Sequence, residues 1–227
     1  MIHFKHTIYL FCKRTLDLFL AIVALIFLTP ILLPIVIGLK CTGEGHIFYV
    51  QKRIGYKNKY FNIIKFATML KNSATMGTMT ITIRNDPRLT PMGGFLRKTK
   101  INEIPQILNV LIGNMSIVGP RPVDKKAFEA CTKEVQDSIY NSKPGITGIG
   151  SIVFRDEENL ISGSKLPPYE YYKQFIAPYK GALEMWYQNK KSFKVDILLM
   201  FLTFWVVVFP RSSIVNSFFT DLPERNF

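Results

Sequence analysis

The N-terminal part of the chain carries an apolar run, residues 18–39, that contains no charged side chain. As a helix rising ~1.5 Å per residue it would reach about 33 Å, close to the hydrocarbon thickness of a bilayer. Thr29-Pro30 falls at its midpoint, and Pro34 follows one turn later. A proline inside a helix removes a backbone donor and kinks or breaks the helix. The pattern therefore predicts a membrane helix with a break at Thr29 and Pro30.

Basic residues flank this run on both sides, with Lys13 and Arg14 before it and Lys40 after it. Charge bias therefore gives no reason to place its two ends on opposite sides of a membrane. The residues alone leave two geometries open: a kinked helix that spans the bilayer, and a re-entrant helix that bends and leaves on the side it entered. In the re-entrant geometry the Thr29 hydroxyl would bond a carbonyl that the break sets free.

Beyond residue 43 the pattern predicts a small, mostly helical α+β domain. Two β-prone segments, residues 47–50 and 60–64, flank a basic turn at residues 51–59. A short helix is expected at residues 94–98. A longer one is expected at residues 102–112, with Asn102 as N-cap and Pro105 in the first turn. A polar helix at 124–140, a loop at 143–150 and a short strand at 152–154 follow.

Aromatic-rich helices are predicted over residues 169–210. The apolar segment 195–209 is short for a membrane crossing, so it indicates an amphipathic helix in the membrane interface, or else a core helix. These patterns divide the chain into a membrane helix (residues 1–42), a central domain (43–194), which the motifs described below make the expected cytosolic catalytic domain, and an interfacial helix with its tail (195–227).

Composition favours an anionic partner at a membrane. The chain has 227 residues and a formal net charge of +13, yet 48% of it is hydrophobic. This balance suits lipid headgroups or nucleotides better than nucleic acid, because the cations gather near one helix end rather than between aromatic residues. The three cysteines have no metal-binding spacing and are expected to be free thiols.

The candidate chemistry lies between residues 84 and 122, where cations surround one predicted helix N-terminus. Such an end carries free N–H groups and partial positive charge, and so attracts phosphate. Arg121 stands between Pro120 and Pro122, which stiffen its backbone and hold its guanidinium for two-point phosphate contact. The other cations of this region are Arg84, Arg88, Arg97, Lys98 and Lys100.

Five motifs in order resemble the bacterial sugar transferases, the catalytic units of the monotopic phosphoglycosyl transferases. The resemblance extends from Lys13-Arg14 to the helix after Asp196. The motifs are Lys65-Phe66-Ala67-Thr68-Met69, Asp86-Pro87-Arg88-Leu89-Thr90, Asn102-Glu103-Ile104-Pro105-Gln106, Gly119-Pro120-Arg121-Pro122 and Lys143-Pro144-Gly145-Ile146-Thr147-Gly148.

The resemblance implies a fold and a reaction. It implies a re-entrant N-terminal helix that breaks at Thr29-Pro30, on the cytosolic face of the bacterial inner membrane. It also implies transfer of a sugar 1-phosphate from a UDP-sugar to polyprenyl phosphate, with release of UMP and with Mg²⁺ beside the catalytic acids. In the family an Asp-Glu pair is catalytic, and its Asp attacks the β-phosphate of the donor. Pro120, Arg121 and Pro122 would contact the donor, as would Arg88, Arg97 and Lys98.

This chain departs from the family at the catalytic pair, because Asn102 stands where the nucleophilic Asp is expected. An amide is a poor nucleophile, although its oxygen can still touch a metal. Asn114 also replaces the Asp of the family's Gly-Asp-Met-Ser.

Three explanations are open. Glu103 takes over as nucleophile or base; another carboxylate enters, from Asp86 or from Asp156, Glu157 and Glu158; or the chain is a catalytically impaired membrane scaffold. Glu103 and Asn102 are thus the expected catalytic and metal-binding residues. Membrane lipid is an expected partner, nucleic acid is not, and a homo-oligomer is allowed.

Overall fold

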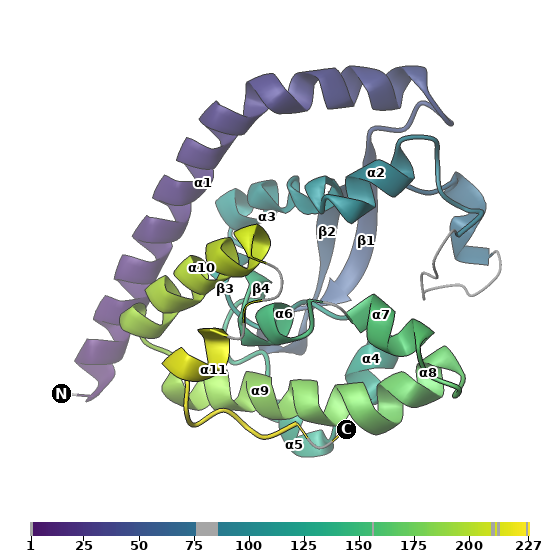
Figure 1. The fold of residues 1–227 in the computed structure, drawn as a ribbon. Helices are drawn as coiled ribbons and strands as arrows, with labels where there is room; N and C mark the ends of the chain where they lie inside the picture. Colours follow the sequence, from purple (N-terminus) through teal and green to yellow (C-terminus); the bar gives the residue numbers. More distant parts are fainter. Residues whose placement is uncertain (1, 76–85, 156, 210–211, 213, 226) are drawn as a thin grey trace.

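The structure is a computed structural model that describes residues 2–75, 86–155, 157–209, 212, 214–225 and 227 (Figure 1). Helices make up most of it, so the mixed, largely helical fold class is confirmed. In chain order the elements are α1 (Ile2–Cys41), β1 (Phe48–Ile54), η1 (Tyr56–Asn58), β2 (Tyr60–Phe66), η2 (Lys71–Thr75), α2 (Gly93–Lys98), η3 (Ile101–Glu103), α3 (Gln106–Ile112), β3 (Ser116–Val118), α4 (Lys125–Glu129), α5 (Lys133–Ser138), β4 (Gly145–Thr147), α6 (Ile149–Val153), α7 (Glu157–Ser162), α8 (Pro168–Tyr171), η4 (Tyr172–Ile176), α9 (Ala177–Lys190), α10 (Phe193–Val208) and α11 (Ile214–Phe218).

Two small sheets frame the site. Strands β1 and β2 form the predicted antiparallel hairpin, with Ile54 opposite Tyr60. The predicted turn over 51–59 is too long, because residues up to Ile54 belong to β1 and the connection is the short η1, where Lys57 and Asn58 have positive φ. Positive φ lets the backbone reverse within a few residues.

The second sheet pairs β3 with β4 in parallel, and β4 lies inside the segment 143–150, which we expected to be a loop. We did not predict β4 because a strand whose partner is distant in sequence leaves little signal in the local composition. A Cβ added to Gly119 would lie 2.3 Å from the Lys143 carbonyl oxygen, so only glycine permits the approach. The predicted strand at 152–154 is wrong, since Ile152 and Val153 end helix α6.

The region before α3 also differs from the prediction. Asn102 is not an N-cap: it lies in the 3₁₀ turn η3, and α3 begins only after Pro105. Lys100 has φ 60, which starts a separate turn before the helix. The predicted polar helix 124–140 is two short helices, α4 and α5, capped by the side chains of Asp124 and Thr132.

Helix α10 has two apolar faces. Leu199, Leu202 and Val206 are buried in the main core with residues of α6 and α9. Phe201, Phe204 and Val207 are exposed. The helix is therefore both a core element and a source of apolar surface.

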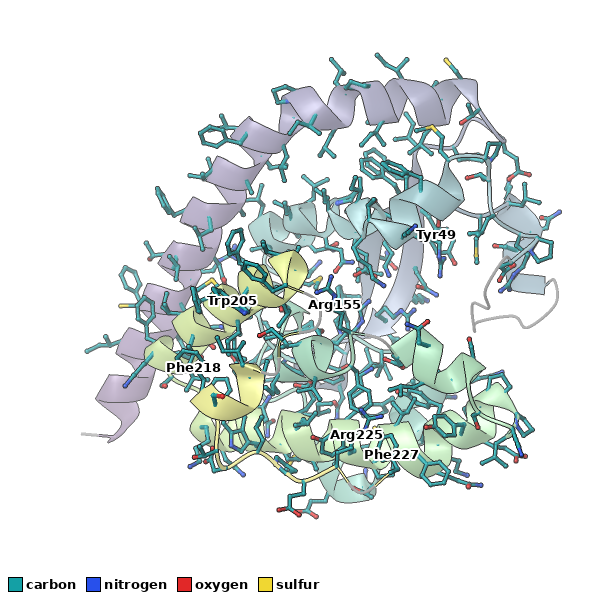
Figure 2. All side chains as sticks on the ribbon, viewed as in Figure 1. Tyr49, Arg155, Trp205, Phe218, Arg225 and Phe227 are labelled. Atoms are coloured by element: carbon teal, nitrogen blue, oxygen red, sulfur yellow. The ribbon has the colours of Figure 1, made fainter. Side chains whose placement is uncertain are left out.

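Helix α1 is one bent helix with Pro30 and Pro34 inside it (Figure 1). The Thr29 hydroxyl donates to the Leu25 carbonyl at 2.6 Å. Among the described residues, one helix, Thr7–Cys41, is long and apolar enough to cross a membrane. Figure 2 shows side chains along its outer edge pointing away from the domain, and several are large and exposed, including Phe19, Ile26 and Phe27.

Polar contacts fix the N-terminal part of α1 to the domain. The Lys13 ammonium lies 2.7 Å from Oδ2 of Asp196 in α10 and donates to the Val118 carbonyl at 2.9 Å. Tyr9 and Tyr187 also donate to Asp196. The next residue along α1 is Arg14, whose guanidinium donates to the Val110 and Leu111 carbonyls, in the last turn of α3. Such contacts satisfy carbonyls that a helix end leaves free.

We expect Asp196→Ala to lower the free energy of unfolding by about 3–5 kcal/mol, because it leaves the buried Lys13 ammonium without its counter-charge. Thermal unfolding in detergent measures the effect. The matched control is Asp137→Ala, which removes the exposed pair with Lys133 (2.9 Å, side chains 81% and 57% exposed) and should change stability by less than about 1 kcal/mol. Equal effects of the two variants would contradict the anchoring role of Asp196.

Candidate functional site

One large cavity, with a volume of about 1590 Å³, lies among the β1–β2 hairpin, η3, α6, α7 and the apolar helices α1 and α10. Its carboxylates are those of Glu44, Glu103, Asp124 and Glu157. The more numerous cations are Arg53, Lys65, Lys71, Arg97, Lys98, Lys100, Arg121, Lys126, Arg155 and Lys180. A cavity with this excess of positive charge attracts polyanions such as a pyrophosphate.

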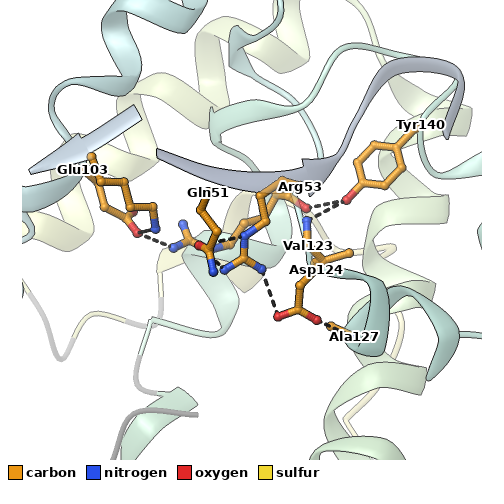
Figure 3. A network of polar contacts seen from close by, with 9 residues as sticks. Gln51, Arg53, Glu103, Val123, Asp124, Ala127 and Tyr140 are labelled. Atoms are coloured by element: carbon orange, nitrogen blue, oxygen red, sulfur yellow. Dashed lines mark hydrogen bonds and ion pairs between the residues drawn. The ribbon is translucent and has the colours of Figure 1, made fainter. Parts of the chain in front are cut away.

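Glu103 is at the centre of the polar wall. Its Oε1 accepts a hydrogen bond from Lys65 Nζ at 2.8 Å and another from Arg121 Nη2 at 2.7 Å (Figure 3). Burial opposes ionisation, but Arg121 and Lys65 outweigh it and hold the pKa of Glu103 well below its usual value. The carboxylate is therefore charged at neutral pH and fixes two cations side by side.

Three separate segments supply this cluster. Lys65 comes from β2, where Ile63 and Lys65 both line the cavity wall, at the two-residue spacing of one strand face. Glu103 ends the 3₁₀ turn η3. Arg121 follows β3. The pairing of β3 with β4, whose backbones approach closely at Gly119, brings Arg121 to the cavity wall.

The backbone of Arg121 is held from both sides. The Tyr140 hydroxyl donates to the Arg121 carbonyl at 2.8 Å and accepts from the Val123 N–H at 3.1 Å. The Pro120 carbonyl accepts from the Gly145 N–H at 2.9 Å. These hydrogen bonds restrain the Pro-Arg-Pro turn in addition to its two prolines, so the turn that we expected to be rigid is also held by distant parts of the fold.

Arg53 forms a second cationic layer. It donates to Gln51 Oε1 at 2.8 Å and to Asp124 Oδ2 at 3.1 Å (Figure 3). Asp124 also accepts from the Ala127 N–H and so caps α4. This chain of contacts links the β1 wall of the cavity to the segment after Arg121.

Several buried polar atoms on the cavity wall find no hydrogen-bond partner within the described part of the chain. They are Asn102 Oδ1, Gln106 Nε2, Ser151 Oγ and Arg155 Nη1. A buried polar atom without a partner costs about 1–3 kcal/mol. Figure 2 places Arg155 in the middle of the domain. A polar, charged ligand in the cavity would satisfy these atoms.

A magnesium ion fits two of the oxygens at this wall. Both ion pairs of Glu103 use Oε1, so Oε2 remains for another ligand, and Asn102 Oδ1 is the neighbouring unsatisfied oxygen. In the described ranges no three His, Cys, Asp or Glu side chains gather to hold a metal. The donor set therefore suits Mg²⁺ completed by water and substrate phosphate, which is its usual protein environment.

The structure brings most of the predicted site residues together. Glu103, Asn102, Arg97, Lys98, Arg121 and Pro122 all line the cavity. Pro120 is behind the wall and positions the turn. Arg88 does not itself line it: its guanidinium forms a two-point ion pair with Asp86, at 2.8 and 2.6 Å, and its side chain is 3% exposed. Arg88 also donates to the carbonyl of Ser73, a cavity-lining residue, so it supports the wall from behind.

Among the alternative carboxylates only some can be located. Asp86 is bound to Arg88, while Glu157 lines the cavity and pairs with Lys180 at 2.7 Å. Arg84 and Asp156 lie outside the described residues, and so does the side chain of Glu158.

Sequence reasoning missed Lys65, Arg53, Arg155 and Lys180 as site residues. Lys65 left a usable signal, because a lysine on the inward face of an apolar strand is unusual. Arg155 follows α6 and Lys180 belongs to α9, so only the folded chain reveals that both reach the cavity.

The sequence model described as bacterial sugar transferase matches residues 8–210. The chain belongs to the bacterial sugar transferase family. This confirms the resemblance and, with it, the expectation of an enzyme. The exopolysaccharide production protein ExoY of Sinorhizobium fredii is 31% identical over 215 residues, which are 88% of this chain and 87% of that protein.

Two further relatives carry names that state an acceptor. The undecaprenyl-phosphate glucose phosphotransferase of Komagataeibacter xylinus is 31% identical, over 88% of this chain and 36% of its own length. The undecaprenyl-phosphate galactose phosphotransferase of Salmonella typhimurium is 35% identical, over 65% of this bacterial sugar transferase and 33% of its own length. The chain thus spans most of ExoY and about a third of these two longer relatives.

Burial lowers the pKa of Lys65 to about 8, although Glu103 opposes this shift. Lys65 is therefore cationic below that pH and loses its charge above it. We expect the affinity for inorganic pyrophosphate to fall by roughly tenfold as the pH rises through this value, since a charge-assisted contact is lost.

Titration calorimetry between pH 7 and 9.5 measures this affinity. In Lys65→Arg the cation does not titrate, so its curve reports only the ionisation of pyrophosphate itself. Coincident curves for the two proteins would refute the role of Lys65.

Proposed function

We propose that this bacterial sugar transferase moves a sugar 1-phosphate from a UDP-sugar to polyprenyl phosphate and releases UMP. The observation that carries the proposal is the cavity, which joins a cationic wall to the apolar helices α1 and α10. A soluble polyanion and a lipid phosphate can meet only where such surfaces are continuous. The names of the relatives, which specify undecaprenyl-phosphate acceptors, support the same reaction.

The reaction requires charge neutralisation more than it requires a base. A phosphate monoester already carries about −1.5 to −2 charges at pH 7, so an acceptor phosphate oxygen needs no proton removed. That oxygen attacks the phosphorus that bears the sugar and forms a new P–O bond. The bond between the two donor phosphates breaks, and UMP leaves with the bridging oxygen and its electron pair. Two anions must approach one another, which the cationic wall makes possible.

In this proposal Arg121 and Lys65 bind the donor pyrophosphate, and Glu103 holds them in place. Arg155 Nη1 and Gln106 Nε2 supply further donors to the phosphates. Asn102 Oδ1 and the second oxygen of Glu103 would hold Mg²⁺, which adds positive charge at the reacting phosphates when bound. The cations Arg97 and Lys98 extend this surface toward the headgroup region.

The proposal also accounts for Asn102. Direct attack by the acceptor needs no protein nucleophile, so the amide is compatible with turnover. Glu103 is a weak base because two cations depress its pKa, and its proposed role is to position them. The catalytically impaired scaffold remains the rival, since an amide adds no charge to balance a metal.

We further propose that α1 is re-entrant and that the protein is monotopic on the cytosolic face of the inner membrane. The N-terminal part of α1 is tied to the domain through Lys13 and Arg14. Near its other end, Leu39 packs with Phe66 and Leu96 of the same domain. Both ends therefore lie on one side, while the exposed residues between them face lipid.

Purified protein in detergent should release UMP from a member of a UDP-sugar panel when Mg²⁺ and polyprenyl phosphate are present. Glu103→Ala should lower kcat/KM by roughly a hundredfold or more, because Arg121 and Lys65 lose the group that fixes them. Lys133→Ala, at an exposed surface pair, should retain normal turnover. A coupled assay of released UMP measures both.

The same assay without acceptor separates the mechanisms. Direct transfer predicts no UMP above background, whereas UMP stoichiometric with protein would establish a covalent route. Absence of turnover with every donor, and in Asn102→Asp as well, would leave the scaffold as the correct account.

Membrane topology can be read from two native thiols. Cys12 and Cys41 bracket the apolar run and are exposed and free. With Cys131→Ser, an impermeant maleimide outside intact spheroplasts should label neither thiol, and both should react after permeabilisation. Labelling of just one thiol in intact spheroplasts would show that α1 crosses the membrane.

A further inference from the structure

Residues 219–225 and 227, which we call the strap, lie beyond the part of the chain that the family model matches, since that match ends at residue 210. Figure 1 shows the strap in yellow, running back along α9. Phe219 is buried, and the centroid of its ring lies 4.9 Å from that of Trp186 in α9. The strap is therefore packed on the domain.

Phe227 is part of an aromatic cluster at the other end of α9. Its ring centroid lies 6.5, 5.9 and 6.0 Å from those of Tyr171, Phe175 and Tyr179. Aromatic pairs at such distances stabilise a fold beyond the area that they bury. The three partners belong to α8, η4 and α9, and Tyr172, the first residue of η4, lines the cavity. The strap thus joins three elements beside the cavity.

Arg225 extends this cluster to the cavity wall. Its guanidinium carbon lies 4.5 Å from the ring centroid of Phe227 and 6.0 Å from that of Phe154 (Figure 2). Phe154 is 5% exposed, lines the cavity and meets the Tyr179 ring edge-on at 5.6 Å. The Lys180 ammonium also lies 5.5 Å from the centroid of Phe154. Cations at these distances are attracted to an aromatic face, so Phe154 is held by the strap and by α9 together.

Arg155 follows Phe154 directly and lines the cavity. Its Nη1 is buried and has no hydrogen-bond partner within the described part of the chain. An arginine side chain has many rotamers, so its direction depends on the contacts that hold it and its neighbours. The packing of Phe154 fixes the backbone from which Arg155 extends, and the strap contributes to that packing.

We infer that Phe227 and Arg225 are positioning residues, which hold Phe154 and thereby keep Arg155 directed at the donor pyrophosphate. The inference rests on the proposed function, in which Arg155 binds that pyrophosphate. A positioning role predicts that the effect of the strap on binding depends on Arg155. A purely structural role predicts effects that add independently.

A double-mutant cycle with inorganic pyrophosphate as the ligand tests this dependence. Titration calorimetry at pH 7 in detergent compares the wild type, Phe227→Ala, Arg155→Ala and the double variant. We expect Arg155→Ala to weaken binding by roughly tenfold, because a charge-assisted contact is lost. Phe227→Ala changes no charge and should weaken binding by roughly fivefold, but it should cause no further loss in the Arg155→Ala background.

Three more variants control for the contact and for the fold. Phe227→Tyr keeps the ring and should bind pyrophosphate as the wild type does. Arg225→Gln changes an exposed residue and should show the same dependence on Arg155 as Phe227→Ala. Asp221→Ala removes an exposed pair with Lys190 elsewhere on the strap, at 2.7 Å with side chains 48% and 56% exposed, and should leave the affinity within about twofold.

Several results would overturn the inference. They are an unchanged affinity in Phe227→Ala or in Arg155→Ala, and an equal loss from Phe227→Ala with and without Arg155. Turnover in a protein whose two losses add independently would refute the positioning role and leave the proposed function standing. Dependent losses in a protein that uses no donor would support the positioning role and refute the transfer reaction.

Discussion

The double ion pair of Glu103 with Lys65 and Arg121 is the contact on which the candidate site depends. Three segments far apart in sequence meet there, each brought by a different element. Without a carboxylate between them, two buried cations at this distance would repel one another and bind more solvent. With Glu103 between them, the two cations stay together, and each keeps further N–H groups that can donate to a phosphate. The β1–β2 hairpin, the 3₁₀ turn η3 and the Pro-Arg-Pro turn each supply one of the three side chains of this cluster.

Membrane association and chemistry are coupled through α1. The helix exposes apolar residues on its outer face, while Lys13 and Arg14 fasten it to α10 and α3. The same helix lines the cavity that contains Glu103. In the reaction that we propose, a helix held in lipid at one face and in the site at another would place the reacting groups at headgroup depth, where one reactant arrives from water and the other from the bilayer.

Asn102 has a consequence beyond the loss of a nucleophile. The cavity wall has more cations than carboxylates, and an amide at this position increases that excess. A more positive wall binds an anionic donor and acceptor together more readily than a balanced one. Asn102 has an unsatisfied oxygen, which would suit a metal ion. Gln106 and Arg155 have unsatisfied N–H donors, which would suit phosphate oxygens. The chemistry we propose uses this excess and requires no covalent intermediate with the protein.

The sequence by itself determined the family, the apolar helix with its prolines and the β1–β2 hairpin, and it predicted Glu103 and Arg121 as site residues, because each rests on local composition or on an ordered motif. Only the tertiary structure decided that Arg88 holds Asp86, that Asn102 caps no helix, and that β4 pairs with β3. It also revealed Lys65, Arg155 and Lys180 on the cavity wall. Those features depend on contacts between segments far apart in the chain, and a side chain's partner across the fold leaves no trace in its neighbours along the sequence.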